Sequence, residues 1–144
     1  MLGVLSPAEV EDVLTKGTIG RLGLVHDGRP YVVPVCYAYA DNHVYGHSMA
    51  GMKMAALQRT PEVCFEVEDV ADLSNWRSVI AWGAVEMLSG TAAERGMDLL
   101  VDRIVPLLAP GSVAAHAAHG GTNQVHATVY RIGLAEKTGR FERQ

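Results

Sequence analysis

The residues best suited to ligand-binding chemistry are a serine and a lysine, placed where a predicted strand gives way to a helix. The segment Tyr45-Gly46-His47-Ser48-Met49-Ala50-Gly51-Met52-Lys53 reads as a strand end, a loop of small residues and the start of a helix. A helix N-terminus presents unpaired N–H groups and the positive end of the helix dipole, which favour a phosphate. The hydroxyl of Ser48 and the ammonium group of Lys53 would add to these donors. A solvated lysine that binds nothing is the plainer interpretation.

A second candidate pair lies at the start of a later predicted strand. The guanidinium group of Arg77, next to the hydroxyl of Ser78, could form a forked contact with a phosphate or a ring carbonyl. The alternative is a surface arginine whose aliphatic stem packs on Trp76. A third candidate is Arg21, because Gly23 nearby would allow another group to approach the backbone.

Other recognisable chemistry is missing from the sequence. There is no glycine-rich phosphate loop, no zinc-protease motif and no hydrolase nucleophile motif. His43 and His47 lie four residues apart on a predicted strand, too far apart for easy metal chelation. His116, His119 and His126 are scattered around a Gly- and Ala-rich segment, so loop or packing roles are favoured over metal binding.

Composition narrows the class of protein. A length of 144 residues suits one domain, over 1–144. The net charge of −4 gives no sign of the basic surface that binds nucleic acid, so we expect no nucleic-acid partner. The N-terminus lacks signal-peptide order, and no apolar run approaches the ~20 residues that span a bilayer. We therefore expect a soluble, cytoplasmic protein with no membrane partner. Cys36 and Cys64 each lie in an apolar run, which predicts buried, reduced thiols.

Helical periodicity occurs in three segments. Ser6-Pro7-Ala8-Glu9 contains a capping box and a proline suited to a first helical turn, and Gly17 ends that helix. A short helix is predicted over 50–59, because Thr60-Pro61 cannot continue it. A longer helix is predicted over 91–108.

Six apolar or alternating segments predict strands, with tight turns at Asp27-Gly28 and Asp41-Asn42. Pro34 cannot donate to a strand ladder, so it marks a sheet edge, a bulge or a point of close approach. The predicted strands span 19–26, 30–40, 43–48, 63–67, 76–88 and 125–134, and a charged tail follows. This order favours a mainly β (α+β) fold, a six-stranded antiparallel barrel with flanking helices.

Taken together, the motifs resemble the pyridoxamine 5′-phosphate oxidase-like flavoproteins. The nearest branch is that of flavin-nucleotide-binding or nitroimidazole-resistance (Nim-type) proteins. The resemblance covers nearly the whole chain, and its order and spacing are more specific than any one motif. The matching segments are Gly20-Arg21-Leu22-Gly23, Gly28-Arg29-Pro30-Tyr31-Val32-Val33-Pro34-Val35, Tyr45-Gly46-His47-Ser48, Gly51-Met52-Lys53, 59–67, Asn75-Trp76-Arg77-Ser78-Val79-Ile80, Tyr130-Arg131-Ile132 and Lys137-Thr138-Gly139-Arg140.

The resemblance implies an FMN-binding split barrel that forms a homodimer, with the cofactor at the subunit interface. The strand from Val33 to Cys36 would run beside the flavin, and Met52-Lys53 matches an Arg-Lys pair that binds the phosphate. Arg77 and Ser78 would reach the cofactor from the partner chain. The full set of expected cofactor-binding residues is Arg21, Val33, Pro34, Val35, Cys36, His47, Ser48, Met52, Lys53, Arg77 and Ser78.

The activity that the resemblance implies is an FMN-dependent oxidoreductase. Its substrate would be a small electron-poor molecule such as a nitroimidazole. His47 matches a histidine placed near the flavin and is the catalytic candidate, as a proton donor or hydrogen-bond donor. The alternatives are that His47 only orients the cofactor, and that the protein binds or senses flavin or haem without catalysis. A third hypothesis is a deazaflavin cofactor on the same barrel. The lack of a further basic residue at Met52 argues against it.

Overall fold

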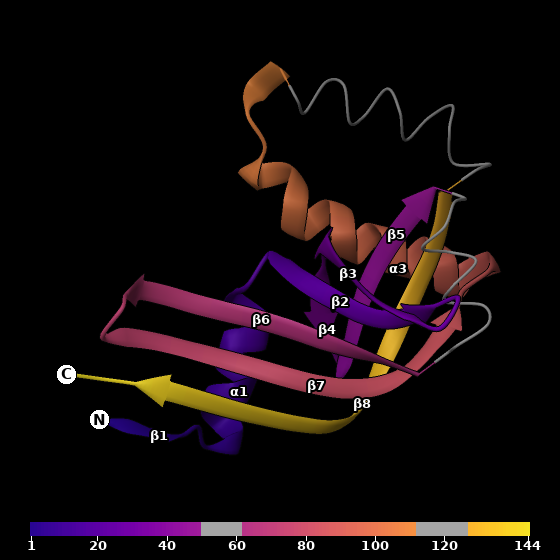
Figure 1. Cartoon of the computed structure of the whole chain (residues 1–144). Helices are drawn as coiled ribbons and strands as arrows, with labels where there is room; N and C mark the ends of the chain where they lie inside the picture. Colours follow the sequence, from indigo (N-terminus) through magenta and orange to yellow (C-terminus); the bar gives the residue numbers. More distant parts are fainter. Residues whose placement is uncertain (50–61, 112–126) are drawn as a thin grey trace.

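The computed structural model describes residues 1–49, 62–111 and 127–144 (Figure 1). In these residues the chain forms eight strands, two α-helices and one short 3-10 helix. The elements are β1 (Leu2–Val4), α1 (Pro7–Lys16), β2 (Ile19–His26), β3 (Arg29–Cys36), β4 (Ala38–Ala40), β5 (His43–Met49), β6 (Glu62–Asp72), β7 (Asn75–Met87), α3 (Gly90–Ile104), η1 (Val105–Leu107) and β8 (Ala127–Glu142). Neither described helix is long and apolar enough to cross a lipid bilayer.

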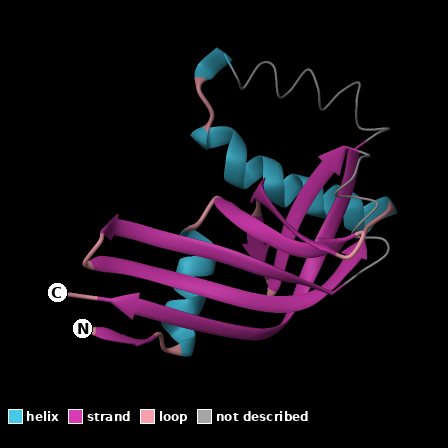
Figure 2. Cartoon of the chain, in the orientation of Figure 1, coloured by secondary structure: helices cyan, strands magenta, loops and turns pink. Residues whose placement is uncertain are grey.

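All eight strands belong to one antiparallel sheet that curls around a core. The strand order is β3-β2-β6-β7-β8-β5-β4, and β1 pairs with β8 beside this path. The two end strands, β3 and β4, are consecutive in the chain and joined through Tyr37 alone. The sheet therefore bends until its ends meet, while the strands at the chain termini project as a flatter extension (Figure 2). The predicted antiparallel barrel with flanking helices is confirmed, with eight strands in place of six.

The core lies inside the curled sheet, and α1 covers one end of it. Helix α1 begins at the predicted capping box, in which the Glu9 N–H donates to the Ser6 hydroxyl (3.2 Å) and the Ser6 N–H donates to the Glu9 carboxylate (2.8 Å). Its buried face packs into the barrel, where Phe65 and Tyr37 meet edge to face at 4.9 Å. The Tyr37 hydroxyl donates to the Leu14 carbonyl at 2.7 Å, which ties the β3–β4 junction to α1.

A second, smaller cluster packs α3 against the other side of β4 and β5. Its buried residues are Ala38, Tyr45, Leu100 and Ile104. The predicted helix over 91–108 ends earlier, at Ile104, and continues as η1 because Pro106 disrupts the α-helical hydrogen-bond pattern. The helix predicted over 50–59 lies outside the described residues.

Both predicted tight turns are confirmed. Asp27 and Gly28 have φ values of 50° and 74°, and Asp41 and Asn42 have values of 50° and 61°. Left-handed geometry at both central positions matches the right-handed twist of the flanking strands. Among the described residues β3 pairs only with β2, so of the three predicted roles for Pro34 the structure shows the sheet edge.

Other parts of the predicted order also differ from the structure. The segment predicted as one strand over 30–40 is divided at Tyr37, because β3 pairs with β2 whereas β4 pairs with β5. Strand β1 was not predicted, and the predicted charged tail is the second half of β8. There β8 lies between β1 and β7, so pairing on both sides makes a strand of a polar sequence.

Candidate functional site

Four of the residues singled out from the sequence lie together on one surface of the sheet. Paired residues in antiparallel strands point to the same side. Arg21 on β2 is opposite Pro34 on β3, while its neighbour Leu22 is buried in the core. Cys36 points outward as well, and so does Ser78, whose partner on β6 is Glu68. We call this surface the outer face. Its side chains are Ile19, Arg21, Val25, Val32, Pro34, Cys36, Cys64, Glu66, Glu68, Ser78, Ile80 and Trp82.

The outer face is largely apolar and exposed. Ile19, Val25, Val32 and Ile80 are 54%, 48%, 68% and 38% exposed. A groove of about 430 Å³ crosses it, with Trp82 and Pro30 among its walls. This volume is in the range of small-molecule sites, which are mostly apolar with a few polar groups. The outer face could therefore bind a flat apolar ligand, a second protein surface or both.

Arg21 lies beside this groove on the outer face. Gly23 lines the groove, and Arg21 is the outward-facing residue two positions before it on β2. The side chain of Arg21 is 46% exposed. Its guanidinium group lies 3.7 Å from a carboxylate oxygen of Glu68 and 4.0 Å from one of Glu66. Arg21 is therefore both available to a ligand and held by two carboxylates of β6.

The pKa of Glu66 is raised to about 7 by this environment. Burial is the largest cause, followed by a hydrogen bond and charge repulsion from Glu68, while Arg21 acts in the opposite direction. A proton held by Glu66 near neutral pH therefore lies beside the carboxyl group of Glu68.

This shift makes stability depend on pH. Because the folded state binds the proton more tightly than the unfolded chain does, stability is greatest below the ordinary carboxyl pKa and falls as pH rises toward 7. We expect Glu66→Gln to be more stable than the wild type at pH 8, by about 1 kcal/mol after solvent screening, and equal to it at pH 4.5. Urea unfolding at both pH values measures this. Glu62→Gln, on the same strand, should keep the wild-type profile; an unchanged profile in Glu66→Gln would refute the assignment.

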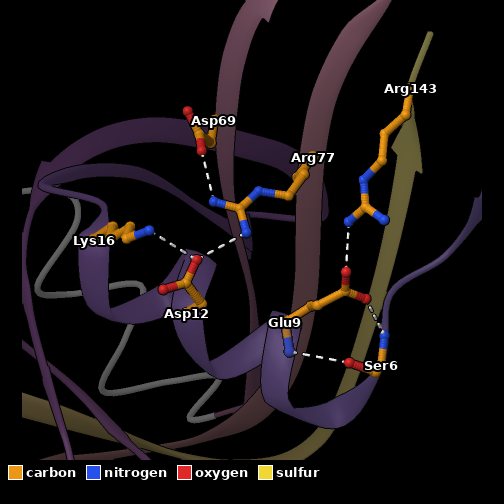
Figure 3. A network of polar contacts seen from close by, with 7 residues as sticks. All are labelled: Ser6, Glu9, Asp12, Lys16, Asp69, Arg77 and Arg143. Carbon is orange, nitrogen blue, oxygen red and sulfur yellow. Dashed lines mark hydrogen bonds and ion pairs between the residues drawn. The ribbon is translucent and has the colours of Figure 1, made fainter.

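Arg77 lies against α1 (Figure 3). As the strand neighbour of Ser78, it points to the opposite side of the sheet. Its guanidinium group donates to Asp12 of α1 at 2.8 Å and to Asp69 of β6 at 2.7 Å. Arg77 holds the pKa of Asp12 below its usual value, and Lys16 adds to the effect from 3.1 Å. In the subunit described, Arg77 therefore braces the β6–β7 hairpin against α1.

We expect Arg77→Ala to lower the melting temperature by about 3–6 °C at pH 7, because two charge-assisted hydrogen bonds are lost. The Asp12 carboxylate is charged at neutral pH and neutralises as pH falls through its lowered pKa. The difference between variant and wild type should therefore shrink below pH 4. Differential scanning calorimetry measures both effects. Arg95→Ala is the control, since its ion pair with Asp41 joins two largely exposed side chains. Equal losses in both variants would count against the brace.

The other expected site residues are dispersed. Val33 and Val35 point into the barrel and contact the core, so of the four β3 residues expected at the site only Pro34 and Cys36 face outward. His47 is half-buried on β5, where it pairs with Val129, and Ser48 pairs with Thr128 on the same strand. Met52 and Lys53, like His116, His119 and His126, lie outside the described residues.

The prediction of buried thiols is wrong. Cys36 is exposed and Cys64 is half-buried, because both occupy outward positions between core residues of their strands. Burial and repulsion from Glu66 raise the pKa of the Cys64 thiol, so it remains protonated at neutral pH.

Sequence reasoning did not single out the carboxylate pair. Its signal was present in β6, where Val63, Phe65 and Val67 alternate with outward residues. Alternation places Glu66 and Glu68 on one face, but only the pairing of β6 with β2 brings Arg21 to them.

Residues 6–141 match one protein-family model, described as pyridoxamine 5′-phosphate oxidase. An uncharacterized protein of Rhizobium meliloti strain 1021 is 33% identical over 88 residues, which are 61% of this chain and 58% of that protein. That alignment therefore spans less than two thirds of the relative's own length.

Solved structures share the architecture over nearly the whole chain. A FAD-binding protein of Mesorhizobium loti has a TM-score of 0.75 at 32% identity, with 98% of each chain covered. A candidate 5-nitroimidazole antibiotic resistance protein of Bacteroides thetaiotaomicron has a TM-score of 0.75 at 19% identity, covering 98% of this chain and 87% of its own. A FAD and haem binding protein of Mycobacterium smegmatis has a TM-score of 0.73 at 17% identity, covering 99% and 74%. The last two share the split-barrel fold.

Proposed function

Because the chain belongs to the pyridoxamine 5′-phosphate oxidase family, we propose that it binds a flavin, FMN, between two copies of itself and uses it to reduce a small electron-poor molecule. The observation that carries this proposal is the outer face. An apolar groove crosses this face and the half-exposed Arg21 lies beside the groove, in a chain 32% identical to a FAD-binding protein.

The groove has the chemistry that a flavin requires. Trp82 and Val32 offer apolar surface to a flat aromatic ring, and the half-exposed guanidinium group of Arg21 offers N–H donors to a polar group of the ligand. Pro34, which has no N–H, leaves the outer edge of β3 without one donor, so a ligand can approach there. Bound flavin would supply the electron chemistry, while these residues orient it and exclude water. Lys53 is the sequence-based candidate for the phosphate.

The exposed apolar side chains of the outer face support the proposal that a second copy of the chain binds there. Monomeric proteins rarely expose a continuous apolar patch of this kind, and a symmetric dimer places one patch against its own copy. Arg21 with Glu66 and Glu68 gives the outer face charges of both signs, which suits pairing with itself. The homodimer is therefore part of the proposal, with the flavin at the covered face.

The chemical step would use His47 as proton donor. Reduction of a nitro group consumes protons as well as electrons, and histidine can donate them near neutral pH. His47 is half-buried on β5 and thus shielded in part from solvent. The alternative proposal is a protein that binds flavin or haem without catalysis, favoured by the Mycobacterium smegmatis relative that is named for both ligands.

The deciding experiment is an absorption spectrum of the purified protein, followed by titration with FMN and, separately, FAD. Bound flavin that is reduced by a nicotinamide nucleotide and reoxidised by a nitroimidazole would support the oxidoreductase. Bound flavin that undergoes neither step would support the non-catalytic alternative. A Soret band without flavin bands would move the function to haem.

We expect Lys53→Ala to weaken FMN binding by about 10- to 100-fold, the loss of one charge-assisted contact to the phosphate. Flavin fluorescence quenching measures the dissociation constant. Lys16→Ala is the control, because Lys16 contacts Asp12 on α1, away from the outer face. Riboflavin, which lacks the phosphate, should bind both variants and the wild type equally. Equal FMN affinity in Lys53→Ala and wild type would remove Lys53 from the site.

A further inference from the structure

The outer face carries a charged cluster in an otherwise apolar surface. Arg21 on β2 lies opposite Glu66 on β6, and Glu68 is the next outward residue of the same strand. On the far side, Ile80 of β7 pairs with Glu66 and Ser78 pairs with Glu68. The three charged groups thus lie between an apolar groove and an apolar strand.

The ionisable groups around Glu66 are few in the described part of the chain. On β2 the neighbour is Arg21, and on β6 the neighbours are Cys64 and Glu68, with Glu62 further along the same face. Strand β7 contributes Ile80 and Ser78, which do not titrate in this range. One strand further, β8 places Arg140 opposite Ser78 and Thr138 opposite Ile80. The charge of the cluster is therefore set by Arg21 and the two carboxyl groups.

We propose that Glu66 and Glu68 take up one shared proton when a second copy of the chain covers the outer face, so that dimer formation is coupled to protonation. This inference rests on the dimer of the proposed function. With both carboxyl groups ionised, each subunit brings a net charge of −1 from the three groups into the interface. With one proton shared, the cluster is neutral. The ionised carboxylate pairs with Arg21, and the protonated carboxyl group donates a hydrogen bond to that carboxylate.

The physical cause is desolvation. An unpaired charge buried in an interface is costly, and a carboxyl group in such a place takes up a proton. The free subunit is already near this point, because the pKa of Glu66 is raised to about 7 while its side chain is still partly exposed. Further burial by the second copy shifts the balance toward the protonated pair. Two like-charged clusters facing each other across a symmetric interface would add repulsion at high pH.

The test is sedimentation of a dilution series between pH 5.5 and 9. We expect the wild-type dimer dissociation constant to be flat at low pH and to rise above pH 7. Its slope should approach about a hundredfold per pH unit, since two protons are taken up per dimer. Glu66→Gln and Glu68→Gln should each flatten this slope and dimerise more tightly than the wild type at pH 9. Glu94→Gln, which removes an exposed carboxylate of α3 away from the outer face, should keep the wild-type slope.

A second measurement counts the protons directly. Dilution calorimetry at pH 8 measures the heat of dimer dissociation in phosphate and in Tris, two buffers with different heats of ionisation. For the wild type the two heats should differ, because dissociation releases protons to the buffer. For Glu66→Gln the two heats should agree. For a dimer too tight to dilute, dissociation by urea at each pH gives the same slope. A dimer whose affinity and heat do not depend on pH or buffer overturns the coupling but leaves the dimer standing. A monomer at every pH and concentration overturns both.

Discussion

Replacing Gly83 with alanine should destabilise the protein by about 3 kcal/mol, one of the two largest effects that we expect. A Cβ atom at this position would lie 1.9 Å from the carbonyl oxygen of Gly133 and 2.8 Å from its carbonyl carbon. Both contacts are with the backbone of the neighbouring strand β8, so no side-chain rotation can relieve them. The register between β7 and β8 shifts at Trp82/Gly83, and this close approach accompanies the bend that curls the sheet.

Gly23→Ala is the matched control for this prediction. Gly23 also lies in a strand, but its added Cβ would be 3.6 Å from the nearest atom, an ordinary contact with Cys64. We therefore expect a change within about 0.5 kcal/mol. Urea unfolding of the two variants gives both free energies. Equal stability of Gly83→Ala and the wild type would show that β7 and β8 do not approach this closely.

Local signals predicted the parts of the fold that depend on neighbouring residues. The capping box fixed the start of α1, and Asp27-Gly28 fixed the first hairpin, because each contains its own hydrogen-bond or dihedral requirement. Strand β1 and the second half of β8 could not be found in this way. Their sequences are short or polar. Strand β1 forms by pairing with β8 more than 130 residues later, and the second half of β8 also pairs with β7, more than 50 residues earlier.

The candidate site was predicted only in part, for a related reason. Sequence reasoning joined Arg77 and Ser78, but consecutive strand residues point to opposite sides, and the structure places Arg77 against α1. Arg21 and Pro34 were named separately, and strand pairing makes them neighbours. Glu66 and Glu68 gain their importance from Arg21, which is 45 positions earlier than Glu66 in the chain, so no local pattern contained the cluster.

Val32→Arg should prevent dimer formation and flavin binding together, which is the second large effect. Val32 is 68% exposed on the edge strand β3 and lines the groove, so an arginine there would place a charge in the proposed interface and fill part of the ligand's space. We expect the dimer dissociation constant to rise by about a hundredfold or more, because an unpaired buried charge is among the costliest interface changes. Sedimentation and flavin fluorescence measure the two effects.

The control for this variant is Val4→Arg, on the edge strand β1. Val4 is 64% exposed, so the two substitutions add the same charge to valines of nearly equal exposure on different surfaces. Unfolding free energies close to the wild type in both variants would show that the fold is intact. If Val32→Arg alone lost both the dimer and the flavin, one surface would serve both functions. If it lost flavin but stayed dimeric, the groove would bind the ligand within one subunit, and the second copy would have to occupy another face. If it kept both, the outer face would not be the site, and the phosphate candidate Lys53 would have to be tested with a different surface.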